Sequence, residues 1–253
     1  MSASDGDDHF LEIELRPPEQ IARRLLVLTA VVQRVVVEHD FKSDEPPGQN
    51  VDDRLFDLRA SLSLSGADQE LTAAESALIA SPAGRVLEDT QYAFGWDIEA
   101  ISAILAATGL IDEPPPPLLT DIRVVEAIFA EDGLTVGNLA ARLRLPGDEY
   151  AARAREIAEL WLWRASTERE IRESAAPERE HLRTQVREVA TEAAAAGLIE
   201  MTSTGDFEIG GGAVSEWSDE VLAGFEIACE ARLRALNWLC GFGASWDAVP
   251  IEV

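Results

Sequence analysis

The stretch SDEVLAGFEIACEARLRALNWLCG, residues 218–241, carries the marks of a long buried helix. Ser218 can accept a free backbone N–H of the first turn, and the carboxylates of Asp219 and Glu220 complement the positive end of the helix dipole. Apolar side chains then recur every three or four positions, which places them on one face. They are Leu222, Phe225, Cys229, Leu233, Leu236 and Cys240.

Similar signals recur along the rest of the chain, and each predicts another amphipathic helix. Proline can open a helix at Pro17–Pro18, and Thr72 with Glu75 has the spacing of a capping box. A hairpin near residues 199–209 is the strand signal that the pattern supports. The predicted fold class is therefore mainly α, a multi-helix globular bundle with one small β-hairpin. The predicted helices cover about residues 17–38, 55–62, 72–81, 90–110, 122–133, 135–143, 148–173, 177–197 and 218–241.

Two segments bear on domain organisation. Residues 1–16 are predicted to form an acidic, flexible N-terminus, because this stretch is rich in Asp and has no helical periodicity. Four consecutive prolines lie within residues 113–118 and favour an extended spacer, since proline fixes φ and lacks a donor. Residues 17–253 then form a single helical domain or two halves divided at this spacer, and both alternatives stay open.

Composition narrows the classes of function. The 253 residues are 47% apolar and carry a net charge of −26, so the chain can bury a core and is not a disordered polyanion. Nucleic acid and anionic membranes are poor partners for such a charge. The start of the chain lacks a cationic segment followed by an apolar run, so we expect a cytoplasmic location.

The sequence also lacks the spacings of a metal or disulfide site. Cys229 and Cys240 lie on one predicted helix about 16 Å apart, beyond disulfide reach. The histidines His9, His39 and His181 are scattered, without other ligand types at metal-binding spacing. We expect neither a metal nor a cofactor.

No nucleophile elbow, phosphate loop or dinucleotide fingerprint accompanies the polar residues. The candidates for a general acid and base are paired carboxylates, either Glu99 with Glu230 or Glu226 with Glu230. Glu99 and Glu230 can equally approach Arg164 or Arg232 and form a buried ion network that fixes helix register. A structural role is favoured, so the chain is not expected to be an enzyme.

Tryptophan gives a second indication of a site. Trp161 and Trp163 lie two positions apart on a helix, a rotation of about 200°, so they cannot face the same core. The outward one packs on a second layer of helices, or it lines an aromatic pocket or an interface beside Arg164. The pattern leaves both alternatives open.

The segment EARLRALNWLCG at residues 230–241, followed by Trp246-Asp247, resembles the C-terminal signature of the bacterial domain-of-unknown-function family 4272. The stretches 96–100, followed by Gly109, and 160–165 are similar to its central and Trp-rich helices. The tail at residues 249–253 departs from it, since an Asp-Thr pair is expected after the proline. The resemblance spans the chain from about residue 17 and implies a largely helical intracellular domain, without an activity.

Two functions follow as hypotheses. The first is a non-enzymatic protein-interaction domain, resembling an acidic inhibitor or immunity protein, whose surface meets a basic protein partner. The second is a small-molecule binder or hydrolase that uses Glu99, Arg164, Glu230 and Asn237. The oligomeric state is left open. The candidate ligand or partner pocket comprises Trp96, Glu99, Trp161, Trp163, Arg164, Glu230, Arg232, Asn237, Trp238 and Asp247.

Overall fold

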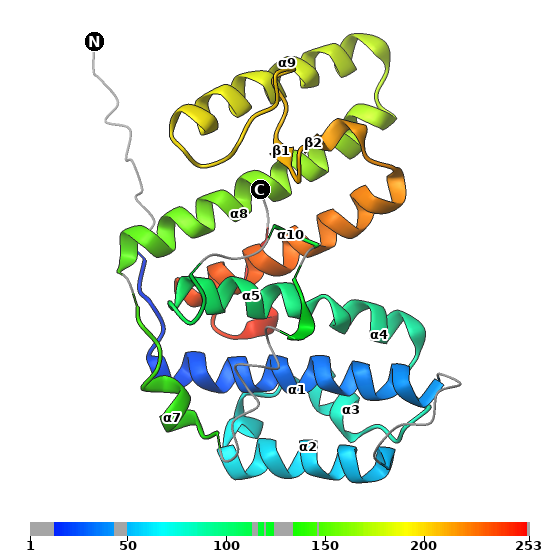
Figure 1. Cartoon of the computed structure of the whole chain (residues 1–253), viewed down its shortest axis with the longest axis vertical. Coiled ribbons are helices and arrows are strands. Elements are labelled where there is room, and N and C mark those ends of the chain that lie inside the picture. Colours follow the sequence, from blue (N-terminus) through cyan, green and yellow to red (C-terminus); the bar gives the residue numbers. More distant parts are fainter. Residues whose placement is uncertain are drawn as a thin grey trace, which may run out of the picture.

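A computed structural model describes residues 13–42, 50–112, 116–118, 120–123, 134–145 and 147–251 (Figure 1). The fold is mainly α with a two-stranded antiparallel sheet, as predicted. Single 3₁₀ turns occur at Ala67–Glu70, Val214–Glu216 and Trp246–Ala248. The helices are α1 (Pro18–Lys42), α2 (Val51–Ser65), α3 (Ala73–Ala80), α4 (Glu88–Gly95), α5 (Asp97–Ala107), α7 (Val136–Ala140), α8 (Asp148–Glu173), α9 (Ala176–Ala195) and α10 (Asp219–Leu239), and the strands are β1 (Glu208–Ile209) and β2 (Gly212–Ala213).

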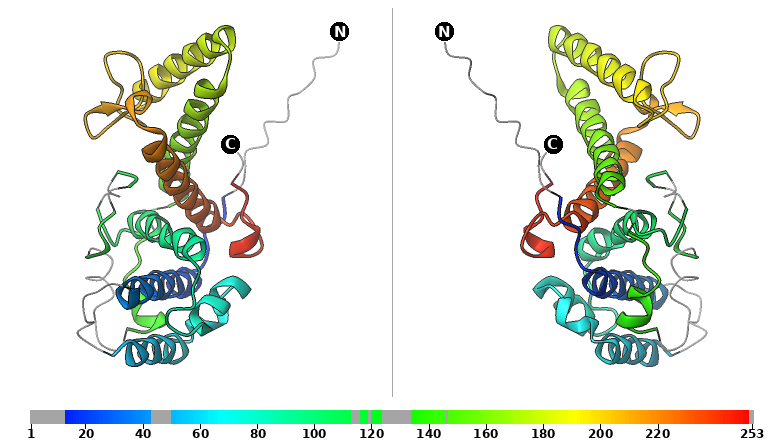
Figure 2. Two further views of the ribbon diagram at one scale, coloured as in Figure 1. Left: turned by 90° about the vertical axis from the view of Figure 1, so that its right-hand side faces the viewer. Right: turned by 90° about the vertical axis from the view of Figure 1, so that its left-hand side faces the viewer.

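The helices form a stack along the long axis of the molecule. α10 lies in the middle and packs against α5 on one side and α8 on the other (Figure 1). α5 rests on α1, which in turn covers α2 and α3, while α9 packs on the outer side of α8. Figure 2 shows that α8 and α9 diverge from one another, with the hairpin beside them.

The central helix confirms the prediction for residues 218–241. The hydroxyl of Ser218 accepts a hydrogen bond from the backbone N–H of Val221 at 3.3 Å, and the helix runs to Leu239. Gly241 follows with a φ of 88°, a conformation that favours glycine. The residues on the predicted stripe are buried, including both cysteines. Local sequence signals therefore suffice to place α10.

The capping box is confirmed as well. The Thr72 hydroxyl accepts the N–H of Glu75 at 3.2 Å, and the Glu75 carboxylate accepts the N–H of Thr72 at 2.8 Å. Glu75 also binds Arg24 of α1. The cap that starts α3 thus docks this helix against α1.

One predicted helix is divided in two. The segment predicted over residues 90–110 breaks at Trp96, which ends α4 and begins α5. The break directs Phe94 toward a small core that α1, α2 and α3 share, whereas Ile101 and Ile104 fill the main core. A continuous helix could not place both sets of side chains in these two cores, and the sequence pattern alone did not show that.

The hairpin extends beyond the predicted residues. Met201 pairs with Phe207 as an isolated antiparallel bridge within the predicted segment. The two-stranded sheet itself joins Glu208 to Ala213 and Ile209 to Gly212. Its turn uses Gly210 and Gly211, both with positive φ, as tight hairpin turns require. The turn of the sheet therefore lies at Gly210-Gly211, just beyond the predicted hairpin.

The main core contains residues from both sides of the proline spacer. Ile21 and Ile104 pack in one cluster with Leu162, Phe225 and Leu233. Pro116, Pro117 and Leu118 are described, whereas residues 113–115 lie outside the described part of the chain. Most of the helix predicted over residues 122–133 lies outside it too.

The described chain begins with residues 13–16, which pack along the end of α10. Arg16 donates hydrogen bonds to the carbonyl oxygens of Trp238 and Gly243, both at 2.6 Å. The backbone N–H of Glu14 donates to the carbonyl of Cys240 at 3.3 Å. Within the N-terminus predicted to be flexible, Glu14 and Arg16 are therefore hydrogen-bonded to the fold, and residues 1–12 lie outside the described chain. None of the described helices combines the length and apolarity that crossing a membrane would need.

Candidate functional site

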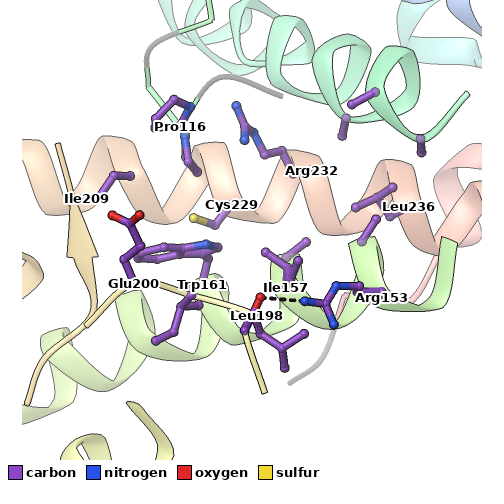
Figure 3. Close-up of a pocket in the computed structure, with 18 of the residues that line it drawn as sticks. Pro116, Arg153, Ile157, Trp161, Leu198, Glu200, Ile209, Cys229, Arg232 and Leu236 are labelled. Carbon is purple, nitrogen blue, oxygen red and sulfur yellow. Dashed lines mark hydrogen bonds between the residues drawn. The ribbon is translucent and has the colours of Figure 1, made fainter. Parts of the chain in front are cut away.

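A cavity of about 760 Å³ lies between α5, α8 and α10 (Figure 3). Three further segments contribute to its lining, namely Pro116–Pro117, residues 197–200 and the start of the hairpin. Its volume falls in the range of known small-molecule sites. We refer to it as the interhelical pocket.

The interhelical pocket exists because the helices that surround it carry small side chains there. The lining includes Ala103, Ala106 and Ala107 of α5 together with Ala154 and Ala158 of α8. A methyl group fills less of the space between diverging helices than a leucine or an isoleucine would. The alanines that keep the helical periodicity therefore also leave room for another molecule.

Larger apolar side chains give the interhelical pocket its shape. Trp161 stands edge-on to two rings, with its centroid 5.3 Å from that of Phe207 and 5.8 Å from that of Phe225. Such edge-to-face contacts fix the indole at the wall. Ile157 lies one turn before Trp161 on α8, and Leu236 lines the pocket from α10 toward the end where Arg153 lies (Figure 3). The lining is thus mainly apolar and preformed, as in typical ligand sites.

Arg232 supplies a cation to the wall, but that cation is already paired. Its guanidinium donates to the Glu99 carboxylate at 2.5 and 2.7 Å and to the Thr120 hydroxyl at 3.2 Å. Glu99 also accepts the Thr120 hydroxyl at 2.9 Å and the backbone N–H of Leu118 at 3.1 Å. The network ties α5 to α10 and to the segment after the prolines. It contains Glu99 and Arg232 of the predicted buried network, whereas Glu230, predicted to join them, lies near Arg234.

Three other charged side chains belong to residues that line the interhelical pocket. Arg153 donates to the carbonyl oxygen of Gly197 at 2.6 Å, which fixes the end of α9 against α8. Glu200 and Glu208 come from the two antiparallel segments of the hairpin that Met201 and Phe207 join. The pocket therefore combines an apolar interior with charged groups from segments far apart in the sequence.

Cys229 lies in the wall of the interhelical pocket, but its thiol is unreactive. Its side chain is fully buried, and this burial raises the pKa of its thiol far above the ordinary value. Burial likewise raises the pKa of the Cys240 thiol to about 11. Since the thiolate is the nucleophile, neither cysteine is suited to covalent chemistry near neutral pH.

Arg164 belongs to a separate, sealed cluster rather than to the interhelical pocket. It donates to both carboxylate oxygens of Asp206 at 2.6 and 2.9 Å and to Glu168 at 2.9 Å. Asp206 also accepts the backbone N–H groups of Phe207 and Ser215 at 2.7 and 3.0 Å. Burial alone would raise the pKa of Asp206, but the hydrogen bonds and the charge of Arg164 lower it below the ordinary value. The cluster anchors the hairpin to α8.

The neighbouring tryptophan packs on a second layer of helices, one of the two alternatives that the sequence left open. Trp163 lies against Ile171, Leu182 and Val186, a cluster shared by α8 and α9. It contacts Phe207 at a ring-centroid distance of 6.3 Å. Trp161 lines the interhelical pocket and Trp163 packs toward α9, but both rings also contact Phe207 and the main core, which the predicted rotation had excluded.

The other predicted site residues lie elsewhere in the fold. Asn237 accepts a hydrogen bond from Arg155 at 2.6 Å and donates to the Pro250 carbonyl at 2.7 Å. Glu230 is 3.9 Å from Arg234 on the same helix, and Asp247 is exposed.

The remaining predicted tryptophans have structural contacts. Trp96 stands edge-on to Tyr92 at 5.8 Å and lies against Gly224 of α10. Trp238 packs edge-on to Trp246 at 5.8 Å. Of the ten predicted residues, Trp161 and Arg232 meet in the interhelical pocket, with Glu99 bound behind Arg232.

Sequence reasoning missed Arg153, Ile157, Glu200, Glu208 and Ile209. The hairpin register could have identified the two acids, because a pairing of Met201 with Phe207 also sets Glu200 opposite Glu208. No comparable signal marks Arg153 or Ile157, since their place depends on how α8 and α10 cross. Within the described ranges, no group of three His, Cys, Asp or Glu side chains is placed to hold a metal ion.

Comparisons with family models, with curated proteins and with solved structures found no match for this chain. The resemblance to the domain-of-unknown-function family 4272 therefore stays a prediction.

Proposed function

We propose that the chain is a small-molecule-binding protein and that the interhelical pocket is its binding site. The observation that supports this proposal is a cavity of about 760 Å³ with a mainly apolar lining. Trp161 is held in place by two aromatic neighbours, and Arg232 by the Glu99 network. A preformed wall lowers the entropic cost of binding, because few side chains must be ordered when the ligand enters.

A reaction is not part of this proposal. The paired carboxylates considered for acid–base chemistry do not share a hydrogen-bond network, since Glu99 binds Arg232 and Glu226 binds Ser166 and Arg169. Glu230 is near Arg234 instead. The four residues of the hydrolase hypothesis lie in different networks, which favours binding over hydrolysis.

The neutral, fluorescent dye Nile red tests the proposal. We expect its emission to rise and shift to shorter wavelength with the native chain, because the interhelical pocket excludes water from the dye. Ala154→Phe places a ring within the pocket and should abolish this change. Ala195→Phe adds the same ring on the exposed end of α9 and is the matched control.

Circular dichroism establishes that both variants retain the native helix content. Equal dye binding by the native chain and a folded Ala154→Phe variant would contradict the proposal, as would the absence of any dye binding to the native chain.

A basic protein partner is the second candidate function, and the net charge of −26 favours it. Several of the few cations are buried in ion pairs, so they do not offset the negative surface. These are Arg24, Arg34, Arg164 and Arg232. We expect a pull-down to capture a basic protein at about 0.05 M salt and to lose it at about 0.5 M, because salt screens charge attraction. Capture of no partner at either concentration would contradict this second candidate.

A further inference from the structure

The hairpin places two carboxylates directly opposite one another at the interhelical pocket. The bridge between Met201 and Phe207 sets the register, and the backbone N–H of Glu208 donates to the carbonyl oxygen of Glu200 at 2.9 Å. Glu200 and Glu208 are therefore cross-strand neighbours. Residues opposite one another on antiparallel strands point to the same face, with Cβ atoms about 5 Å apart. Both residues line the pocket, with Glu200 exposed to solvent and Glu208 half-buried.

These two carboxylates lack the cation that Glu99 and Asp206 possess. Within the described ranges, neither Glu200 nor Glu208 forms an ion pair. Like charges directly opposite one another on a sheet are destabilising. By contrast, Glu99 and Asp206 each bind an arginine. The pair at the hairpin thus has an unmet attraction for positive charge.

The remaining charges around the interhelical pocket do not cancel this attraction. Arg232 is neutralised by Glu99. Arg153 keeps its charge, because the Gly197 carbonyl that it binds is neutral, so two unpaired carboxylates stand against one unpaired cation. Figure 3 shows Glu200 and Trp161 at one end of the pocket and Arg153 at the other. The net charge of −26 further raises the local concentration of cations and lowers that of anions.

We propose that the ligand of the interhelical pocket is an organic cation with an aromatic or aliphatic body. This inference rests on the proposed function and names its ligand class. The body would lie among the alanines of α5 and α8, and a protonated amine would bind Glu200 and Glu208 in charge-assisted hydrogen bonds. The indole of Trp161 lies at the same end and offers an aromatic surface that attracts cations.

Three probes that share one biphenyl body test this inference. They carry an aminomethyl, a hydroxymethyl or a carboxylate group at the same position, so they are cationic, neutral and anionic at neutral pH. Each is titrated against Nile red bound to the native chain at low salt. We expect the amine to displace the dye at concentrations about tenfold lower than the alcohol, a difference of about 1.4 kcal/mol, and the carboxylate to be the weakest.

Glutamine substitutions connect that preference to the two carboxylates. Glu200→Gln and Glu208→Gln keep the shape of the side chain and remove its charge. Each should weaken amine binding by about 3- to 10-fold, and the double variant should bind amine and alcohol equally. Glu192→Gln removes the same charge from an exposed position of α9 outside the pocket and should leave the preference unchanged. Because the substitutions relieve repulsion, the double variant should melt at the same or a higher temperature than the native chain.

The outcomes separate this inference from the proposed function. If all three probes displace Nile red equally from a pocket that Ala154→Phe closes, the cation inference is wrong and the binding pocket remains. An amine preference that survives in the double variant also overturns the inference, because the preference then has another origin. If Nile red binds the Ala154→Phe variant as it binds the native chain, the proposed function and the inference fall together.

Discussion

The ion pairs at the α1 end of the helical stack differ from the two carboxylates, Glu200 and Glu208, at the hairpin. At the α1 end, Arg34 donates to Glu38 at 2.8 Å, and Arg24 binds Glu75, the residue that caps α3. At the hairpin end, Glu200 and Glu208 face a cavity, and no described cation pairs with them. A charge that the fold neutralises itself fixes how helices pack, whereas a charge left unpaired beside an open cavity is available to a ligand. The comparison therefore separates architecture from site.

Arg164 offers the strongest way to break the comparison, because it is an internally paired arginine at the hairpin end. Arg164→Met should lower the free energy of unfolding by about 3–5 kcal/mol, since Asp206 would stay buried without a cation and Glu168 would keep only Arg172. Urea unfolding followed by circular dichroism measures this change.

Arg187→Met is the control for that substitution. The Arg187 side chain is 48% exposed and lies 3.4 Å from Glu180. Its loss should cost no more than about 0.5 kcal/mol, because exposed ion pairs contribute little to stability. Similar losses from both variants would show that the cluster around Arg164 does not anchor the hairpin.

Asp97 sharpens the comparison at the α1 end. It is a buried carboxyl group that forms no ion pair with an arginine in the described part of the chain. Burial, followed by the nearby charge of Glu75, raises the pKa of Asp97 to about 7, despite Arg24 and Arg234. The folded chain then keeps a proton on Asp97 that the unfolded chain has lost. This group therefore makes the native chain less stable as pH rises from about 4 to about 7.

The Asp97→Asn variant should not lose stability in this way as the pH rises, because asparagine does not ionise. At pH about 8 it should be more stable than the native chain by about 4 kcal/mol, and at pH about 4 the difference should nearly vanish. Urea midpoints across this pH range measure the effect. A difference that is constant with pH would contradict the raised pKa of Asp97.

The smallest expected effect on stability comes from Thr72, which caps α3. The N–H of Glu75 loses its acceptor in Thr72→Ala. This variant should be less stable by about 1 kcal/mol, the usual effect of removing a helix cap. Ser76 is exposed in the same helix. Ser76→Ala is the control and should change stability by less than about 0.5 kcal/mol, as is usual for surface positions. Thermal unfolding of the two variants compares them, and equal melting temperatures would argue against the capping box as a source of stability.

The parts of the fold that local sequence controls were predicted, and the parts that depend on tertiary contacts were not. Ser218 and the stripe through Phe225 and Leu233 place α10, because a cap and a helical period are local signals. The break at Trp96 depends on two separate cores, which no local pattern shows.

The candidate site divides in the same way. Trp161 was identified from its two-position spacing to Trp163, and Arg232 as a possible ion partner of Glu99; both line the pocket. Asp206, the partner of Arg164, is 42 positions away, and helical periodicity says nothing about contacts at that separation. Glu200 and Glu208 could not be identified as pocket residues from local sequence, because this depends on the hairpin register and on the cavity beside them.

A crystal structure of the chain with 4-(aminomethyl)biphenyl tests the central claim most directly. The account predicts density for the two rings between α5, α8 and α10, with the ammonium within hydrogen-bond distance of Glu200 and Glu208. Density for the amine at another surface, or an interhelical pocket closed by its own side chains, would contradict it.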